Sequence, residues 1–520
     1  MGTYLNPGNS GFVDIISRKY VDKTGMIGVV NNAMATGWKL ICVSRPRRFG
    51  KSYAAQMLCA YYDKTVDSHR LFDGLKIASI PDYEKHINHY DVIYLNMTDV
   101  LAETSADDLV PFIKRSILRE LLDTYPDIRQ VEGFAATLVN AVEVIGGKFI
   151  VIIDEWDAPL REHPETERDY LNLLRALFKS SATTAKLFAA VYMTGILPIK
   201  KTKTQSALSD FEEYTMLDPG PFAEYVGFTK GEVRALCDES GVDFSEMKRW
   251  YDGYEMPEVG SIYNPNSVMR SIMKRRFDSY WSKSSAAENL LDFISRDVDG
   301  LRQTITELMG GVEVEIDTLG YNNDLTYTTR DAALTMLTHL GYLSYNQEKR
   351  TVRIPNEEIR LEFARTLRED KNPETMHRVR ESDQLIMNTI HGDGQAVAEQ
   401  IKRVHMEAAN PLNANSEDSL RAVIQVAYFA YKDYYVKFEE LPTGTGYADI
   451  VYFPKQGKGV PALLIELKWN RSAVGAIQQI KEKCYPDALR GYGGELLLVG
   501  ISYDKKSRAY ECQIEACTEN

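Results

Sequence analysis

The chain has 520 residues, well beyond the roughly 250–300 residues at which a single core stops growing, so a one-domain protein is excluded and two or three domains are expected. Hydrophobic residues make up 44% of the chain and charged residues 26%, as in ordinary globular proteins, which excludes a disordered or fibrous chain. The net charge of −13 excludes a protein that is basic all over, but it leaves room for a local basic site.

Membrane and disulfide signals are both missing from the sequence. No apolar run approaches the roughly 18–20 residues that a membrane-spanning helix needs, and the first residues do not combine a basic segment with an apolar one as a secretory signal does. The six cysteines show no metal-ligand spacing. We therefore expect a cytoplasmic protein with no membrane partner and with reduced cysteines.

The first 230 residues alternate short apolar runs with longer amphipathic stretches, which is the pattern of an α/β domain. The runs are Leu40–Val43, Val92–Leu95, Phe149–Ile153 and Leu187–Met193. Because they are apolar almost throughout, we predict parallel strands covered on both faces. Residues 105–125 carry apolar side chains at helical spacing and predict one of the covering helices.

A phosphate-binding motif follows the first predicted strand. The segment SRPRRFGKS ends in Gly50, Lys51 and Ser52 and leads into an apolar helical stretch, as a Walker A loop does. In such a loop backbone N–H groups surround the β-phosphate, Lys51 neutralises the β- and γ-phosphates and Ser52 binds Mg²⁺. Arg45 departs from the GxxxxGK(S/T) pattern because it occupies the position of the first glycine.

The strand predicted at residues 149–153 gives this loop its context, because it ends in Asp154 and Glu155. In a Walker B strand Asp154 would hold Mg²⁺ through water and Glu155 would orient the attacking water. The alternative is a charged strand end that faces solvent. The two motifs in this order predict a protein that binds and hydrolyses ATP with Mg²⁺.

Three further residues are candidates for the same site. Arg47 and Arg48 lie inside the loop, where either could contact phosphate charge directly or from a neighbouring subunit. The alternative is a solvated basic turn. Thr194 ends the strand AAVYMT, where it could sense the γ-phosphate or simply bond the backbone.

The pattern changes at about residue 231. Aromatic, turn-rich segments such as WYDGYEM and SIYNPNSV indicate a separate module or lid. Residues 331–367 are typical of a helix, two short strands joined by a charged turn, and a second helix, which predicts a winged-helix-like element. The polar stretch 367–376 predicts a linker. We therefore predict three domains, at residues 1–230, 231–375 and 376–520.

Two carboxylates and a lysine come together near the end of the chain. Asp449 lies in the strand-like run ADIVYF, and Glu466 and Lys468 share one face of the following run LLIELKW. A divalent cation between the acids would relieve their repulsion and activate water for phosphodiester cleavage, with Lys468 steadying that water or the phosphate. The alternative is an internal salt bridge of Lys468 with either acid.

Two features surround this cluster. Glu417 begins a predicted helix and is a candidate third metal ligand, although a first-turn acid also compensates the helix dipole. Residues 455–490 contain seven basic residues and three acidic ones, against the sign of the whole chain, which favours a polyanionic substrate.

Together the two sites resemble a bacterial and archaeal family, the AAA-ATPase-like proteins with a C-terminal PD-(D/E)XK nuclease-like domain. The segments that carry the resemblance span nearly the whole chain: YVDKTGMI through RPRRFGKS, IIDEWDAPL, MTGILPIKK, WYDGYEM, IYNPNSV, YADIVY, LLIELKW and AIQQIKEKCY. The resemblance implies that the arginine at the first-glycine position is a family feature. It also implies an α/β fold with a P-loop NTPase parallel-sheet domain, a helical or winged-helix-like middle and a restriction-endonuclease-like αβββαβ C-terminal domain.

The resemblance assigns site positions residue by residue. Lys51, Ser52, Asp154 and Glu155 fall on the nucleotide site. The D…ExK positions, the upstream helix acid and a polar position beside the site fall on Asp449, Glu466, Lys468, Glu417 and Gln478.

Our functional hypothesis is an ATP-binding and ATP-hydrolysing protein coupled to a Mg²⁺-dependent nuclease acting on nucleic acid, with DNA favoured over RNA. The alternative is an ATP-operated switch or scaffold whose C-terminal domain binds nucleic acid or a partner without cutting. The sequence leaves the oligomeric state and the strandedness of the substrate open.

Overall fold

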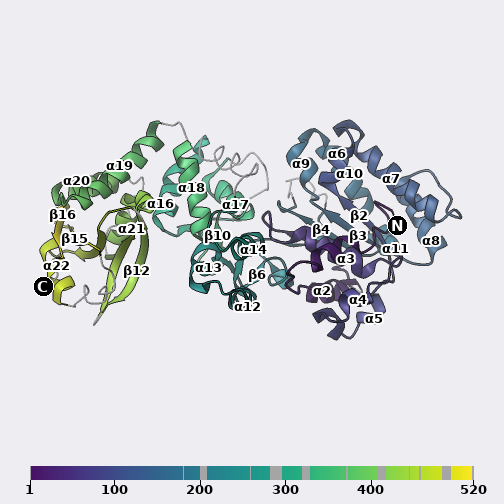
Figure 1. Ribbon diagram of the computed structural model, residues 1–520. Coiled ribbons are helices and arrows are strands. Elements are labelled where there is room, and N and C mark those ends of the chain that lie inside the picture. Colours follow the sequence, from purple (N-terminus) through teal and green to yellow (C-terminus); the bar gives the residue numbers. More distant parts are fainter. Residues whose placement is uncertain are drawn as a thin grey trace. The chain divides into compact units, whose positions relative to one another are not determined.

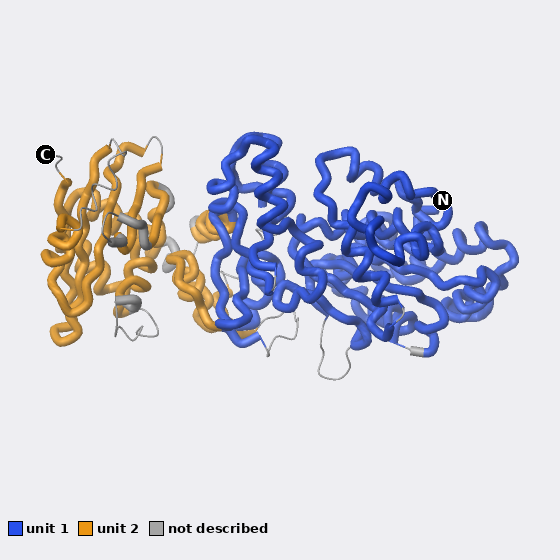
Figure 2. The backbone as a smooth tube through the Cα atoms, turned by 90° about the horizontal axis from the view of Figure 1, so that it is seen from below, with its two compact units in different colours: residues 1–281, 316–327, 331–358 blue, residues 282–315, 328–330, 359–520 orange. Residues whose placement is uncertain are grey.

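The computed structural model describes residues 2–34, 36–179, 181–199, 208–257, 259–281, 296–318, 328–369, 373–407, 417–443, 446–455, 458–482 and 494–517. The chain separates into two compact units (Figure 2). Unit 1 comprises residues 1–281, 316–327 and 331–358, and unit 2 comprises residues 282–315, 328–330 and 359–520. The division into three domains after residues 230 and 375 stays a prediction.

A five-stranded parallel sheet in the order β2-β3-β4-β1-β5 dominates the first part of unit 1 (Figure 1). Its elements are α1 (Ser10–Ile16), α2 (Gly25–Met34), β1 (Leu40–Ser44), α3 (Lys51–Tyr62), α4 (His69–Phe72), α5 (Tyr83–His86), β2 (Asp91–Asn96), α6 (Met97–Glu103), α7 (Leu109–Thr124), α8 (Phe134–Ile145), β3 (Phe149–Asp154), α9 (Ala158–Glu162), α10 (Glu167–Phe178), α11 (Ser181–Leu187), β4 (Phe188–Gly195) and β5 (Glu212–Tyr214). The strands β1 to β4 agree with the four predicted runs within two residues at each end, so the predicted parallel sheet is confirmed.

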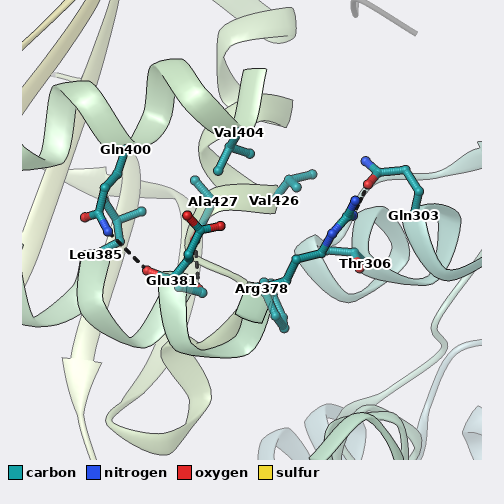
Figure 3. A pocket seen from close by; sticks show the side chains of 11 residues that line it. Gln303, Thr306, Arg378, Glu381, Leu385, Gln400, Val404, Val426 and Ala427 are labelled. Carbon is teal, nitrogen blue, oxygen red and sulfur yellow. Dashed lines mark hydrogen bonds between the residues drawn. The ribbon is translucent and has the colours of Figure 1, made fainter. Parts of the chain in front are cut away.

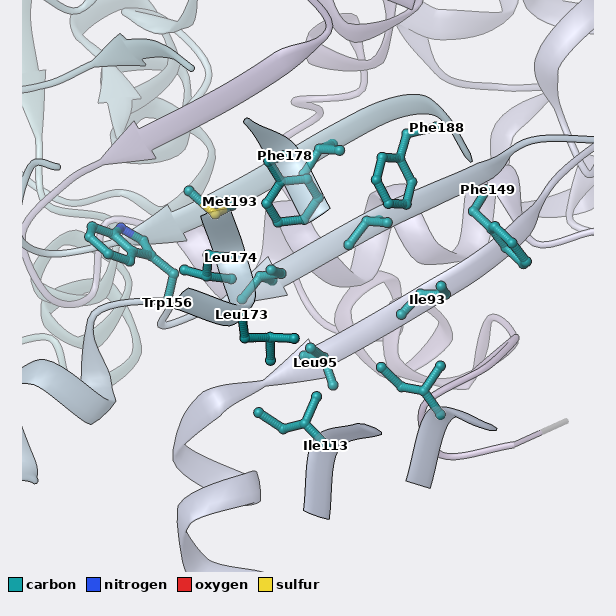
Figure 4. Close-up of a cluster of buried hydrophobic side chains, with 14 of the residues drawn as sticks. Ile93, Leu95, Ile113, Phe149, Trp156, Leu173, Leu174, Phe178, Phe188 and Met193 are labelled. Carbon is teal, nitrogen blue, oxygen red and sulfur yellow. The ribbon is translucent and has the colours of Figure 1, made fainter. Parts of the chain in front are cut away.

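Helices cover both faces of this sheet, which is why its strands are apolar almost throughout. The helix α3 packs on one face, and α7 and α10 pack on the other. Figure 4 shows the second face, where the strand residues Ile93, Leu95, Phe149, Phe188 and Met193 meet the helix residues Ile113, Leu173, Leu174 and Phe178. This core fixes the strand ends that carry the predicted nucleotide site.

The rest of unit 1 contains a small antiparallel sheet in the order β6-β8-β7, with helices around it. The elements that follow β5 are β6 (Phe228–Thr229), α12 (Lys230–Ser240), α13 (Phe244–Tyr251), β7 (Tyr254–Met256), β8 (Gly260–Tyr263), α14 (Pro265–Lys274), α17 (Arg330–His339), β10 (Ser344–Asn346) and β11 (Thr351–Arg353). The next helix, α18 (Glu357–Glu369), belongs to unit 2 from residue 359 onward. The pair β10 and β11 is antiparallel, so the predicted order of helix, hairpin and helix is confirmed.

Unit 2 is built on a five-stranded mixed sheet in the order β12-β13-β14-β15-β16, in which only β14 and β15 are parallel neighbours. Its elements are α16 (Leu301–Gly310), β9 (Val314–Glu315), α19 (Pro373–Ile390), α20 (Gly394–Glu407), α21 (Glu417–Ala427), β12 (Tyr435–Thr443), β13 (Gly446–Pro454), β14 (Ala462–Trp469), α22 (Ala473–Glu482), β15 (Leu496–Asp504) and β16 (Ala509–Ala516). The order α21-β12-β13-β14-α22-β15 is the expected αβββαβ core, and β16 adds one edge strand.

The predicted linker at residues 367–376 is shorter than expected, because α18 extends to Glu369 and α19 already begins at Pro373. Residues 370–372 lie outside the described residues. Across the described ranges, no helix is both long enough and apolar enough to cross a membrane.

Candidate functional site

The phosphate loop leaves β1 at Ser44 and enters α3 at Lys51. Arg48 has φ 68° and Gly50 has φ 93°, so two left-handed residues turn the chain before the helix begins. Ser44 pairs with Gly195 of β4, which places the loop at the carboxyl edge of the sheet. The first N–H groups of α3 have no partner within the helix and are available to an anion at this edge.

Arg45, at the first-glycine position, points into the protein and is fully buried. Its backbone N–H donates to the carbonyl of Gly195 at 3.0 Å, and its Nη1 donates to the carbonyls of Ser44 and Tyr214 at 3.0 and 3.1 Å. Burial lowers the pKa of Arg45 to about 10. The backbone at Arg45 is not left-handed and does not require glycine, and the side chain ties the loop to β5.

Lys51 and Asp154 form the buried centre of the predicted nucleotide site. Lys51 is 3% exposed, its Nζ donates to the carbonyl of Pro46 at 3.0 Å, and burial lowers its pKa. Asp154 is 0% exposed, and neither of its oxygens receives a hydrogen bond of ordinary geometry from a described residue. Burial raises the pKa of Asp154 to about 6, with the nearby Ser52 hydroxyl opposing the rise. The predicted neighbours Lys51, Ser52 and Asp154 are therefore brought together.

Glu155 follows Asp154 in a left-handed conformation, with φ 53°. One carboxylate oxygen lies 3.9 Å from Nζ of Lys51, and the other accepts a hydrogen bond from Nη2 of Arg161 at 3.1 Å. Nε of Arg161 also donates to Asp157 at 2.9 Å, and Asp157 accepts backbone N–H groups at the end of β4. Arg161 and Asp157 were not predicted from the sequence, although their spacing of four residues at a helix start was a usable signal.

The loop arginines have different environments. Arg48 donates from Nη1 to the carbonyl oxygens of Tyr280 and of Trp281, the latter at 3.3 Å. Arg47 is half-buried, and its carbonyl accepts a hydrogen bond from the side-chain amide of Asn264 at 3.5 Å. Arg48 is therefore bound to the segment that follows α14, and a role of either arginine toward phosphate stays a prediction.

Thr194 lies at the expected strand end, where it pairs with Asp154 of β3 and Val43 of β1. Its hydroxyl donates to the carbonyl of Val43 at 3.0 Å, and the residue is fully buried. This is the backbone bond that the sequence left open as the alternative to a phosphate sensor.

Asp449 and Glu466 stand side by side in unit 2. The antiparallel pairing of β13 and β14 includes Ile450 opposite Ile465, and the two acids occupy the next positions of the same register. Asp449 accepts the backbone N–H of Leu467 at 2.8 Å, which orients its carboxylate toward β14. The predicted pair of acids is thus brought together on two neighbouring strands.

Each of these acids already contacts a cation or an amide. Nη2 of Arg421, on α21, donates to Oδ1 of Asp449 at 2.8 Å. Nζ of Lys468 donates to Oε1 of Glu466 at 3.0 Å, and the side-chain amide of Gln479 donates to the same oxygen. Glu466 is 2% exposed and Lys468 is 7% exposed. The predicted salt bridge therefore exists, and the cluster also includes Arg421, which no sequence motif had marked.

Gln478 and Glu417 were also predicted for this site, but no described contact joins either side chain to the acid pair. Gln478 donates its side-chain amide to Glu482 at 2.9 Å on the exposed side of α22, so the prediction is displaced by one residue from Gln479. Glu417 is the first residue of α21, and its side chain lies outside the described residues. Among described residues no group of three or more His, Cys, Asp or Glu side chains forms a metal cluster.

Unit 2 also contains a small pocket among α16, α19, α20 and α21 (Figure 3). Arg378 donates a hydrogen bond to Gln303 on one side of it. On the other side Gln400 donates to the carbonyl of Glu381 at 3.5 Å. The residues that line this pocket are not those of the acid pair.

Comparisons with known proteins match two segments of the chain. Residues 8–204 match the family model described as a predicted AAA-ATPase, and residues 416–512 match the PD-(D/E)XK nuclease superfamily. An uncharacterized protein encoded in the vnfD 5′ region of Azotobacter chroococcum mcd 1 is 23% identical over 510 residues, with 94% of each chain covered.

Solved structures are similar only at a low level. The Aeropyrum pernix ORC2 protein in ADPNP-ADP complexes has a TM-score of 0.25 and 15% identity, covering 66% of this chain and 93% of that one. The Aeropyrum pernix ORC1 protein in complex with DNA has a TM-score of 0.24 and 12% identity, covering 71% and 98%. A signal transduction ATPase with numerous domains from Pyrococcus horikoshii has a TM-score of 0.24 and 11% identity, covering 80% and 58%.

The family matches and the geometry fall on the same residues of the chain. The chain therefore contains a predicted AAA-ATPase domain, which includes the phosphate loop and Asp154, and a C-terminal domain of the PD-(D/E)XK nuclease superfamily, which includes Asp449, Glu466 and Lys468.

Proposed function

We propose that the chain binds and hydrolyses ATP in its AAA-ATPase domain and cleaves nucleic acid, DNA in the first place, in its nuclease-superfamily domain. The observation that carries the first half is the buried carboxylate of Asp154, which lacks hydrogen bonds of ordinary geometry from described residues and lies beside the buried amine of Lys51. An unsatisfied buried polar group costs about 1–3 kcal/mol, and more when charged, unless a ligand supplies its partners. Mg²⁺ with a nucleotide would supply them.

The residues at this edge of the sheet fit Mg-ATP. Asp154 and the Ser52 hydroxyl offer the oxygen ligands that Mg²⁺ prefers, and bound Mg²⁺ would neutralise phosphate charge. Lys51 would exchange the carbonyl of Pro46 for phosphate oxygens. Glu155, held by Arg161, would orient the attacking water.

The second half rests on the two facing acids of β13 and β14. Asp449 and Glu466 would hold a divalent cation, with Glu417 as a third ligand, and the cation would activate water for attack on phosphorus. Lys468, on the same face as Glu466, would steady the phosphate while Gln479 keeps Glu466 in place.

A second candidate function is an ATP-operated switch whose C-terminal domain binds nucleic acid without cutting it. One observation favours it: Asp449 and Glu466 already contact Arg421 and Lys468, so the acids are neutralised without a metal. A site of this composition would bind a phosphate backbone through its two cations.

ATP turnover tests the first half. Lys51→Ala should lower the ATP turnover of the full chain by about a hundredfold or more, because it removes the amine that would neutralise the β- and γ-phosphates. Glu155→Gln should keep ATP binding and lose turnover. Hydrolysis at the unaltered rate in Lys51→Ala would overturn the assignment of the phosphate loop.

Cleavage of linear DNA, circular DNA and RNA with Mg²⁺ or Mn²⁺, with and without ATP, tests the second half. Asp449→Asn should abolish cleavage. Gln479→Ala should lower it by roughly tenfold through loss of a hydrogen bond to Glu466, while the matched change Gln478→Ala, on the exposed side of the same helix, should not. Binding without cutting under every condition would favour the switch.

A further inference from the structure

Arg421 is placed to control access to Asp449. It projects from α21, which packs against β14, and its Nη2 lies 2.8 Å from Oδ1 of Asp449. The other oxygen of Asp449 accepts the N–H of Leu467 at 2.8 Å, so the carboxylate cannot turn away from the arginine without losing that bond. Asp449, which would bind a metal in the proposed function, is therefore already paired with the guanidinium group of Arg421.

Among the described side chains, each acid of the pair has one cationic partner. Two carboxylates, Asp449 and Glu466, face two cationic side chains, Arg421 and Lys468, at 2.8 and 3.0 Å. A divalent cation that enters this cluster meets the charge of Arg421 at short range, and repulsion between like charges is strong where solvent is restricted. In the cluster as it stands, metal binding is therefore opposed.

The two cation–acid pairs differ in how accessible they are to an incoming substrate. The side chains of Arg421 and Asp449 are 21% and 13% exposed, whereas those of Lys468 and Glu466 are only 9% and 3% exposed. The first pair is therefore the one that a substrate can reach. A guanidinium group binds phosphate at least as well as carboxylate, with its planar fork matching two oxygens.

We propose that Arg421 is a substrate-operated gate for the metal site: it neutralises Asp449 in the free protein and moves to a backbone phosphate when nucleic acid binds, which frees Asp449 for a divalent cation. This proposal rests on the proposed nuclease function. The gate would confine the hydrolytic site to protein that already holds a substrate.

Binding of Mn²⁺ to the nucleotide-free full chain, followed by electron paramagnetic resonance, tests the gate. Arg421→Gln should bind Mn²⁺ about tenfold more tightly than the unaltered chain, since it removes one charged hydrogen bond from Asp449. The gain should disappear in the double variant Arg421→Gln with Asp449→Asn. Arg421→Lys, which keeps the charge, should show little gain.

The unaltered chain supplies a second test that does not depend on the folding of a variant. A short phosphorothioate DNA oligonucleotide, which resists cleavage, should raise the Asp449-dependent affinity for Mn²⁺ by a similar factor. The same oligonucleotide should not raise the Mn²⁺ affinity of Arg421→Gln, where the gate is already open. Equal Mn²⁺ affinity of the chain with and without oligonucleotide, or of Arg421→Gln and the unaltered chain, overturns the gate.

Failure of the gate and failure of the nuclease give different results. A chain that cuts DNA while Arg421→Gln leaves the Mn²⁺ affinity unchanged has a nuclease site without a gate. A chain that never cuts, but in which Arg421→Gln raises the Asp449-dependent Mn²⁺ affinity, has the gate while the nuclease function fails.

Discussion

Two buried aspartates on neighbouring strands differ in the number of their hydrogen-bond partners. Asp91, at the start of β2, is 3% exposed and accepts hydrogen bonds from Asn6 at 2.8 Å and Tyr125 at 2.7 Å, with Lys64 at 2.7 Å. Asp154, at the end of β3, is 0% exposed and receives no hydrogen bond of ordinary geometry from the part of the chain that the structure describes. Asp91 therefore stabilises the fold, whereas the buried carboxylate of Asp154 lowers the free energy of unfolding.

Asp154→Asn should therefore stabilise the nucleotide-free protein at neutral pH. The pKa of Asp154 is raised from 3.8 to about 6, so the folded state keeps its proton to higher pH than the unfolded state does. The free energy of unfolding then falls as pH rises from about 4 to about 6 and stays low above that range. Removing the acid should restore at most about 3 kcal/mol at pH 7 and nothing near pH 4. Unfolding by urea across this pH range measures the difference.

The matched variant Asp91→Asn should behave in the opposite way, because it disturbs a network in which Asp91 serves three partners. It should lower the free energy of unfolding at pH 7 by about 1–3 kcal/mol. A loss of stability in Asp154→Asn at pH 7 would mean that the buried carboxylate of Asp154 does not destabilise the nucleotide-free fold.

At the scale of elements, the phosphate loop is bound by segments far along the chain within unit 1. Its middle residues each contact one of them: Pro46 lies against Gly341, Arg47 accepts from Asn264, Arg48 donates to Tyr280 and Trp281, and the ring of Phe49 packs edge-on against Tyr254 at 5.3 Å. The motifs WYDGYEM and IYNPNSV, which the residue pattern assigned to a separate module or lid, therefore support the loop. A conformational change of the loop on nucleotide binding would therefore also move these segments.

Arg48→Gly isolates the contribution of the side chain, because glycine accepts the left-handed backbone at φ 68° without strain. The variant should bind a non-hydrolysable ATP analogue about tenfold more weakly, since a charged hydrogen bond that holds the loop is lost. Calorimetric titration gives the affinity.

A matched change is available at Arg275, which has φ 48° and is exposed. Arg275→Gly removes the same kind of side chain from the same kind of backbone, away from the loop, and should leave the affinity unchanged. Equal affinities of the two variants would mean that the bond from Arg48 to residues 280–281 does not support the loop.

Most of the strands that could be predicted are inner strands, and β2, which lies at the edge of its sheet, is buried along most of its length. β1, β3 and β4 are inner strands of their sheet, and burial on both faces leaves a continuous apolar run in the sequence. The strands β5, β12 and β16, which the residue pattern alone does not mark, all lie at sheet edges. An edge strand keeps polar side chains and a short or alternating pattern, so its signal resembles that of a loop.

The residues of the candidate sites also divide into those that could be predicted from the sequence and those that could not. Lys51, Asp154, Asp449 and Glu466 could be predicted because each stands at a fixed place on a strand or a motif. Gln479 was missed by one residue, because the rotation of α22 about its axis relative to β14 is set by packing and not by spacing. Arg161 and Arg421 were missed because the partner of an arginine is decided by tertiary contact.

At the scale of the molecule, unit 2 draws on three separated parts of the chain. The helix α16 comes from residues 282–315 and packs against α21 from residues 359–520. At Gly310, the end of α16, a Cβ atom would stand 2.9 Å from the backbone carbonyl group of Gln425. A fragment that begins at residue 376 would lack this helix, which belongs to the same compact unit.

Gly310→Ala should therefore weaken unit 2 while leaving unit 1 intact. The added methyl group meets backbone rather than a flexible side chain, which costs about 1–3 kcal/mol and should lower one melting transition of the full chain by about 3–8 °C. The matched change Gly231→Ala, in α12 of unit 1, meets no atom within 4 Å and should be neutral or slightly stabilising, because alanine favours a helix. ATP should raise the other transition, since the proposed nucleotide site lies in unit 1. If Gly310→Ala lowered the transition that ATP raises, the two units would not melt independently, and the division of the chain into two folding units would be wrong.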